Sequence, residues 1–232
     1  MKLRGITFEC VNKPLLDGEF IPPEKFRRAF LSTAAKPVCL AVERNDGLTA
    51  VYDTFIHGTP ERYEADCAYI EQTVKLLLWT KGGYKVTVCG DEAVARHIAD
   101  LYAPGGRRSF DAAFMARVYE KPFETAALPY EHKPLEKDLS KPLGRHLDGC
   151  RIGFDAGGSD RKVSAVIDGV PVFSEEVLWS PKTSPNCAYH FCEIVASLRA
   201  AAEKIPRVDA IGISSAGIFI NSRTMVASLF HS

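Results

Sequence analysis

A stretch that combines an acidic residue, two glycines, a hydroxyl and basic residues lies between positions 152 and 162. It reads Ile-Gly-Phe-Asp-Ala-Gly-Gly-Ser-Asp-Arg-Lys, and an apolar alternation over 163–167 follows it. Gly157 and Gly158 let backbone N–H groups approach an anion, because no Cβ atom stands in the way. Asp155 could then hold a magnesium ion through water, with the ion bridging the phosphates of a nucleotide. The alternative is a β-hairpin whose glycine turn only reverses the chain.

Basic side chains follow this turn directly. Arg161 and Lys162 are candidate phosphate contacts, but the alternation of a strand could equally leave either of them in solvent. The hydroxyl of Ser159 lies between the glycines and these cations. The stretch therefore predicts an anion site or a plain hairpin, and its residues alone leave both open.

The elements around the turn have a regular order. We expect strands at 151–155, 162–167 and 172–179, a helix over 189–204 and a returning buried strand at 208–215. Phe191, Ile194, Val195, Leu198 and Ile205 are predicted to form the inner face of that helix. Three meandering strands, a helix and a returning strand are thus expected to position the glycine turn.

The N-terminal half predicts an α/β lobe of its own. We expect a helix over 24–34, two antiparallel strands at 38–42 and 48–56 around Asn45–Asp46–Gly47, and a helix over 61–80. A strand at 85–89 and two helices follow, the first with Asp91 at its N-terminus and the second over 110–119. Prolines interrupt residues 121–149, which we interpret as an extended connection, so the predicted domains are 1–145 and 146–232.

Composition limits the class of protein. The 232 residues are 46% hydrophobic, and 29 basic residues balance 29 acidic ones, so no global charge attracts nucleic acid or membrane. Seven cysteines without any Cys-x-x-Cys motif suggest reduced core residues rather than a zinc site. The N-terminus has no apolar signal core, and no stretch approaches the ~18 to 20 apolar residues of a membrane span, so we expect a cytoplasmic protein.

This order of elements, with Asp-x-Gly-Gly-Ser after the first strand, resembles the first half of the ribonuclease-H-like ATPase fold of actin, heat-shock chaperones and sugar kinases. More narrowly, it resembles the ROK family of sugar kinases and sugar-responsive repressors. Residues 154–162 stand where those proteins carry an Asp-x-Gly-Gly-Thr-Lys phosphate loop, and 211–217 resemble their second glycine-containing strand and loop. The implied fold class is α/β, an ATPase-fold lobe preceded by a separate small α/β lobe.

The resemblance also implies two sets of ligand contacts. ATP and Mg²⁺ are expected at the first motif, with Asp155 near the metal through water, and the contacts are Asp155, Gly157, Gly158, Ser159 and Lys162. A sugar is expected at the second motif, at Ser215, Gly217, Asn221 and Arg223. For Ser215 the alternative is simple packing at a strand end.

The sequence departs from the ROK pattern in three ways. Ser159 replaces the usual threonine, and Asp160 and Arg161 stand between it and Lys162. The family's catalytic aspartate belongs to an Asn-Asp motif downstream of the second loop, and no such motif follows Gly217. The zinc-binding histidine and cysteine cluster of many relatives is also absent. We therefore expect an N-terminal portion of a longer protein, with the general base beyond residue 232.

The leading hypothesis is a ROK-like sugar kinase, which transfers the γ-phosphoryl group of ATP to a sugar hydroxyl. If active, it is a carbohydrate kinase. The alternative is a non-catalytic protein of the same fold that senses a sugar or nucleotide, or takes part in an assembly. No helix-turn-helix pattern supports DNA binding. Trp179 and the proline-rich connection are candidates for an interface in a homodimer, although the sequence does not fix the oligomeric state.

Overall fold

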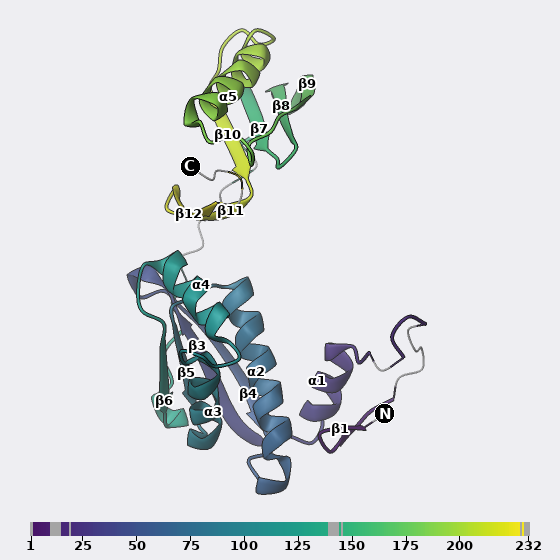
Figure 1. The fold of residues 1–232 in the computed structure, drawn as a ribbon, viewed down its shortest axis with the longest axis vertical. Coiled ribbons are helices and arrows are strands. Elements are labelled where there is room, and N and C mark those ends of the chain that lie inside the picture. Colours follow the sequence, from purple (N-terminus) through teal and green to yellow (C-terminus); the bar gives the residue numbers. More distant parts are fainter. Residues whose placement is uncertain are drawn as a thin grey trace. The chain divides into compact units, whose positions relative to one another are not determined.

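The computed structural model describes residues 2–9, 15–18, 20–138, 144, 146–227 and 229. The chain divides into two compact units, Met1–Ser140 and Lys141–Ser232, and each combines helices with β-sheet (Figure 1). Residue 145, at which the sequence predicted the division, lies outside the described residues.

The first unit is built around a four-stranded sheet. Its elements are β1 (Lys2–Leu3), β2 (Ile6–Thr7), α1 (Pro23–Leu31), β3 (Lys36–Glu43), β4 (Thr49–Ile56), α2 (Tyr63–Thr80), β5 (Lys85–Cys89), α3 (Glu92–Tyr102), α4 (Ser109–Tyr119) and β6 (Glu124–Leu128). The strand order is β4-β3-β5-β6; β3 is antiparallel to both of its neighbours, and β5 is parallel to β6. Helices α2 and α3 lie side by side against one face of the sheet (Figure 1). The first unit is thus a mixed α/β unit.

Local signals placed most of these elements correctly. The turn between β3 and β4 has Asp46 at φ 62° and Gly47 at φ 66°, a left-handed conformation that asparagine, aspartate and glycine tolerate best. The side chain of Asp91 accepts a hydrogen bond from the Val94 amide at 2.9 Å, as expected of a helix N-cap. Helix α1 ends at Leu31, three residues before the predicted end.

The interpretation of residues 121–149 as a connection is wrong for its first part. Strand β6 pairs with β5 from Lys85–Glu124 to Cys89–Leu128. It is an exposed edge strand of mostly small residues, held by backbone hydrogen bonds, so it shows no apolar alternation in the sequence. Beyond it, Lys133 forms an ion pair with Asp53 at 2.7 Å, which also ties this segment to the first unit.

A buried carboxylate joins three elements of the first unit. Asp66 on α2 is only 1% exposed and accepts hydrogen bonds from the His57 and Gly58 amides at 3.0 and 2.8 Å and from His57 Nδ1 at 2.9 Å. The His57 ring packs edge-on against Phe30 of α1, with 4.7 Å between the ring centroids. The end of β4, α1 and α2 therefore share one polar centre inside the core.

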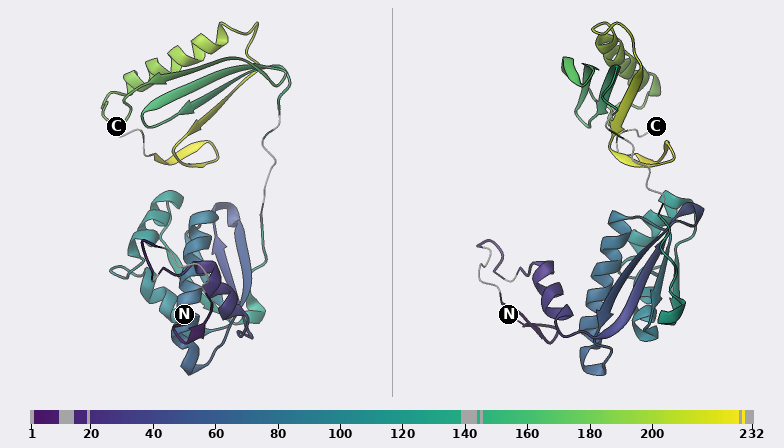
Figure 2. Two further views of the ribbon diagram at one scale, coloured as in Figure 1. Left: turned by 90° about the vertical axis from the view of Figure 1, so that its right-hand side faces the viewer. Right: turned by 180° about the vertical axis from the view of Figure 1, so that it is seen from behind.

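The second unit has a four-stranded sheet crossed by one helix. Its elements are β7 (Cys150–Ala156), β8 (Asp160–Ile167), β9 (Val170–Leu178), α5 (Cys187–Ala202), β10 (Ala210–Ser215), β11 (Gly217–Ile220) and β12 (Arg223–Ala227). The strand order is β10-β7-β8-β9; β7, β8 and β9 form an antiparallel meander, and β10 returns parallel to β7. The predicted order of three strands, a helix and a returning strand is confirmed, and Figure 2 shows α5 over one face of the sheet.

The core of this unit lies between α5 and the first two strands. Alternate residues of β7 and β8 meet the helix, and the buried cluster is Cys150, Ile152, Phe154, Ala156, Val163, Ala165, Trp179, Ala201, Ile205 and Leu229. Because α5 packs over β7 and β8, two predictions are wrong. Phe191 is 68% exposed rather than on the inner face, and β10 is exposed along nearly its whole length rather than buried.

A second hairpin, β11 and β12, follows β10 and was not predicted. Asn221 and Ser222 form its turn with φ of 51° and 63°. A Cβ atom on Gly217 would lie 2.5 Å from the Val226 carbonyl oxygen, so only glycine fits where the two strands meet. Of the strand and loop expected at 211–217, β10 forms the strand, and Gly217 begins a two-stranded ribbon.

The cysteines differ in their surroundings. Among the described residues Cys39, Cys67, Cys89 and Cys150 are buried and unbridged, as predicted for core cysteines, whereas Cys187 and Cys192 are exposed on α5. Cys10 lies outside the described residues. In the described part of the chain, no helix is long and apolar enough to cross a membrane.

Replacing Asp66 by alanine tests the buried polar centre of the first unit. Asp66→Ala leaves two amides and the His57 ring without their acceptor, so we expect a loss of about 3 kcal/mol in the free energy of unfolding. Urea unfolding followed by circular dichroism measures it. Gln72→Ala, an exposed substitution on the same helix, should change the stability by less than about 0.5 kcal/mol. Equal stability of the two variants would contradict the assignment.

Candidate functional site

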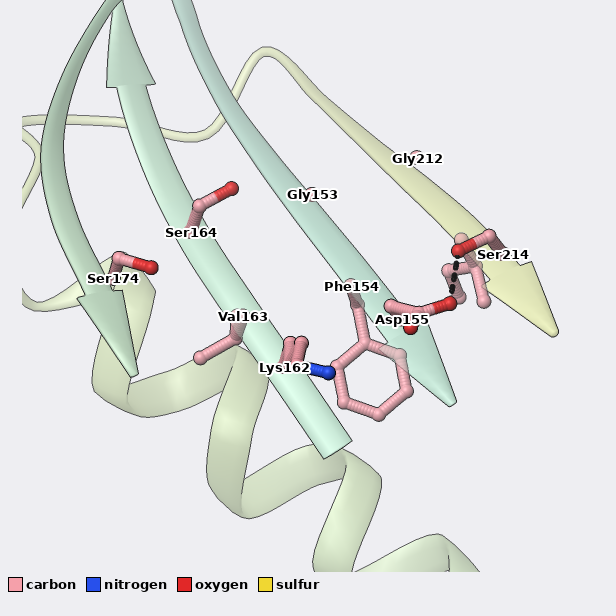
Figure 3. A pocket seen from close by; sticks show the side chains of 10 residues that line it. Gly153, Phe154, Asp155, Lys162, Val163, Ser164, Ser174, Gly212 and Ser214 are labelled. Carbon is pink, nitrogen blue, oxygen red and sulfur yellow. Dashed lines mark hydrogen bonds between the residues drawn. The ribbon is translucent and has the colours of Figure 1, made fainter. Parts of the chain in front are cut away.

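The face of the second sheet that α5 leaves uncovered carries small and polar residues. They line a shallow, open hollow of about 510 Å³ (Figure 3), formed by Gly153, Asp155, Lys162, Ser164, Gly212 and Ser214. Two rows run across the strands: Ser214, Asp155 and Lys162 are register partners, as are Gly212, Gly153 and Ser164. The row of Gly212, Gly153 and Ser164 leaves space for the hollow. The row of Ser214, Asp155 and Lys162 lies at the ends of β7 and β10.

Asp155 is held by a neighbour that the sequence did not single out as its partner. The Ser214 hydroxyl donates a hydrogen bond to Asp155 Oδ1 at 2.5 Å, and Figure 3 shows the two side chains pointing toward one another from β7 and β10. Both residues are exposed. One carboxylate oxygen is thus oriented by the protein, while the side chain stays accessible from solvent.

The glycine turn joins β7 to β8 as a hairpin, so the hairpin interpretation is correct for the backbone. A Cβ atom on Gly157 would lie 2.5 Å from the Asp160 carbonyl oxygen, which explains glycine there by close packing. Gly158 adopts no left-handed φ. Among the hydrogen bonds between described residues, the amides of Gly158 and Ser159 donate none. These two N–H groups can serve an anion, so a hairpin and an anion site are compatible here.

Trp179 fixes this turn. Its indole Nε1–H donates to the Gly157 carbonyl at 2.8 Å, and its amide donates to the Ser159 carbonyl at 3.1 Å. The side chain is 5% exposed and belongs to the core, so Trp179 does not offer the interface surface suggested by the sequence. Pairing of β8 with β9 brings this residue beside a turn that is about twenty positions earlier, a proximity without any local signal.

Lys162 lies on the open face, but its ammonium group already has a partner. Asp160 Oδ2 is 2.7 Å from Lys162 Nζ. This contact raises the pKa of Lys162 and lowers the pKa of the Asp160 carboxyl. A phosphate at Lys162 would therefore compete with a carboxylate of the same hairpin.

Arg161 points to the opposite face. Its side chain is buried under α5, where NH1 donates to Ser197 Oγ at 2.6 Å and the guanidinium forms an ion pair with Glu193. The sequence offered Arg161 as a phosphate contact, but the structure uses it to hold α5 on the sheet. Alternation along β8 separates it from Lys162.

The residues expected to contact a sugar lie at and beyond the end of β10. Ser215 ends the strand opposite Ala156, and its hydroxyl oxygen is buried without a hydrogen-bond partner among the described residues. Gly217 and Asn221 each have a conformational reason for their residue type, in the close approach and the turn described above. Arg223 is exposed on β12. Their contact with a sugar stays a prediction.

A resident metal would depend on Asp155. Within the described ranges, no group of three or more His, Cys, Asp or Glu side chains is arranged to hold a metal ion. A magnesium ion commonly uses one or two carboxylates together with phosphate and water oxygens. A single exposed and oriented carboxylate at Asp155 fits that mode of binding.

Comparisons with known proteins add little to this geometry. No protein-family model matches the chain, and no curated protein matches it. Among solved structures, an exopolyphosphatase from Cytophaga hutchinsonii is similar at 11% identity and a TM-score of 0.23. The match covers 78% of this chain but 64% of that protein.

Removing the indole hydrogen bond tests how the turn is held. We expect Trp179→Phe to raise the rate of amide hydrogen exchange in residues 156–161 several-fold, because loss of a bond worth about 1 kcal/mol favours local opening. Hydrogen–deuterium exchange read by mass spectrometry measures it. The matched control is Trp79→Phe, which removes the indole bond to Asp111 in the first unit and should leave this segment unchanged. Unchanged exchange in Trp179→Phe would argue against the assigned role.

Proposed function

We propose that the second unit binds the phosphate groups of ATP with Mg²⁺ and belongs to a ROK-like sugar kinase. The observation that carries the proposal is the meeting of three features at one end of the sheet. An oriented carboxylate, Asp155, ends β7; the glycine turn follows it directly; and the end of the parallel strand β10 lies alongside. Ligands of open α/β sheets commonly bind at the carboxyl ends of strands.

Each part of the site has a distinct role in this proposal. The amides of Gly158 and Ser159 donate to phosphate oxygens, and Asp155 holds a water-bound magnesium ion that neutralises phosphate charge. Ser214 keeps the Asp155 carboxylate in place through its hydroxyl. Positioning and charge neutralisation provide most of the catalysis in phosphoryl transfer, so rigid strand ends suit the task.

The sugar is proposed to bind beside the phosphates, at the end of β10. Of these residues Ser215 is nearest to the glycine turn in register, because it pairs with Ala156, one residue before the turn. Gly217, Asn221 and Arg223 extend the surface along the second hairpin. In the reaction a sugar hydroxyl oxygen attacks the γ-phosphorus, ADP leaves, and a general base takes the hydroxyl proton.

Calorimetric titration of the chain with ATP and Mg²⁺ tests the proposal. We expect Asp155→Ala to weaken binding at least tenfold in the presence of Mg²⁺ and much less in its absence, because the carboxylate acts through the metal. Glu203→Ala removes an exposed carboxylate at the far end of α5 and should bind as the wild type does. Equal affinity of Asp155→Ala and the wild type would remove Asp155 from the site. Absence of binding by the wild-type chain would refute the proposed function.

A further inference from the structure

We infer that Lys182, on the loop between β9 and α5, is the lysine that contacts the phosphate at the glycine turn. The inference rests on the proposed function and deepens it, because it assigns to a second segment of the chain the cationic role that the sequence placed at Lys162.

The position comes from the packing around Gly158. A Cβ atom built on this residue would lie 3.1 Å from Lys182 Nζ and 3.2 Å from its Cε. Since Gly158 adopts no left-handed φ, backbone conformation alone does not require glycine there. The missing side chain instead leaves room for the end of Lys182 to approach the turn at Gly158.

The loop that carries Lys182 is anchored before and after it. Trp179 binds the turn through its indole and its amide, and the Ser180 amide donates to the Tyr189 hydroxyl at 2.9 Å. The buried ring of His190 donates from Nε2 to the Pro181 carbonyl at 2.9 Å. The backbone immediately preceding Lys182 is therefore fixed to both the turn and α5, which reduces the entropy lost when the lysine binds an anion.

The charges around Lys162 favour the same assignment. Its ammonium is paired with Asp160 at 2.7 Å, and Glu176, its register partner on β9, places a second carboxylate near it. A triphosphate approaching Lys162 meets these carboxylates as well as the lysine. Lys182 Nζ lies instead against Gly158, where the amides of Gly158 and Ser159 donate no hydrogen bond among the described residues and can bind an anion.

Lysine substitutions provide the test, with titration of ATP and Mg²⁺ as the measurement. We expect Lys182→Ala to weaken binding about tenfold and Lys182→Arg to retain most of it, because a charge-assisted contact is lost in the first and kept in the second. Lys162→Met is the matched control, with less than a twofold change expected. Lys182 is exposed, so its variants should keep the wild-type circular dichroism spectrum and unfolding midpoint.

A substitution at Gly158 tests whether the effect of changing the turn on ATP binding depends on Lys182. Gly158→Ala places a methyl group against the Lys182 side chain, so it should weaken binding in the wild type and have less than a twofold effect in the Lys182→Ala background. Wild-type affinity of Lys182→Ala, or an equal effect of Gly158→Ala in both backgrounds, would overturn the inference and leave the proposed function standing. Absence of ATP binding by the wild-type chain would refute both.

Discussion

The second unit depends on strand β7, which is hydrogen-bonded along both edges, to β8 on one side and to β10 on the other. Successive side chains of β7 point to opposite faces of the sheet, so core residues lie on one face and candidate site residues on the other. Ile152, Phe154 and Ala156 turn to α5 and form the core, while Gly153 and Asp155 turn to the open face. A shift of one residue in its register would exchange these two sets and bring Asp155 into the core. The position of the candidate site is therefore tied to the burial of its own strand.

The ends of this strand are held from elsewhere in the unit. At the start of β7, Asp209 accepts hydrogen bonds from the Cys150 amide at 2.8 Å and from Arg207 at 2.7 Å. At its end, the indole of Trp179 binds the Gly157 carbonyl. Binding groups placed on such a framework need little reorganisation to meet a ligand, which is the physical advantage of a preorganised site.

Charged groups of the second unit are divided between the two faces of the sheet. The buried Arg161 is paired with the half-buried Glu193 on the helix side, where loss of Glu193 would leave a buried guanidinium without its carboxylate. Asp155, Lys162 and Asp160 stand on or beside the open face, where solvent screens them. The Arg161–Glu193 pair secures α5, whereas Lys162 and Asp160 pair with each other and Asp155 stays accessible on the open face. The first unit has a comparable division, with Asp66 buried as a structural centre and Lys133 paired with Asp53 at the surface.

Short-range patterns in the sequence determined many elements of both units. The apolar alternation over 163–167 predicted β8, Asn45–Asp46–Gly47 predicted the hairpin of β3 and β4, and Asp91 predicted a helix start. These signals depend on neighbours along the chain, which each segment carries with it. Tertiary structure alone decided that β6 joins the sheet, that Arg161 is buried, and that Trp179 and Lys182 meet the glycine turn. These outcomes depend on cross-strand register and on α5 packing over β7 and β8, which bring together residues that are distant in sequence.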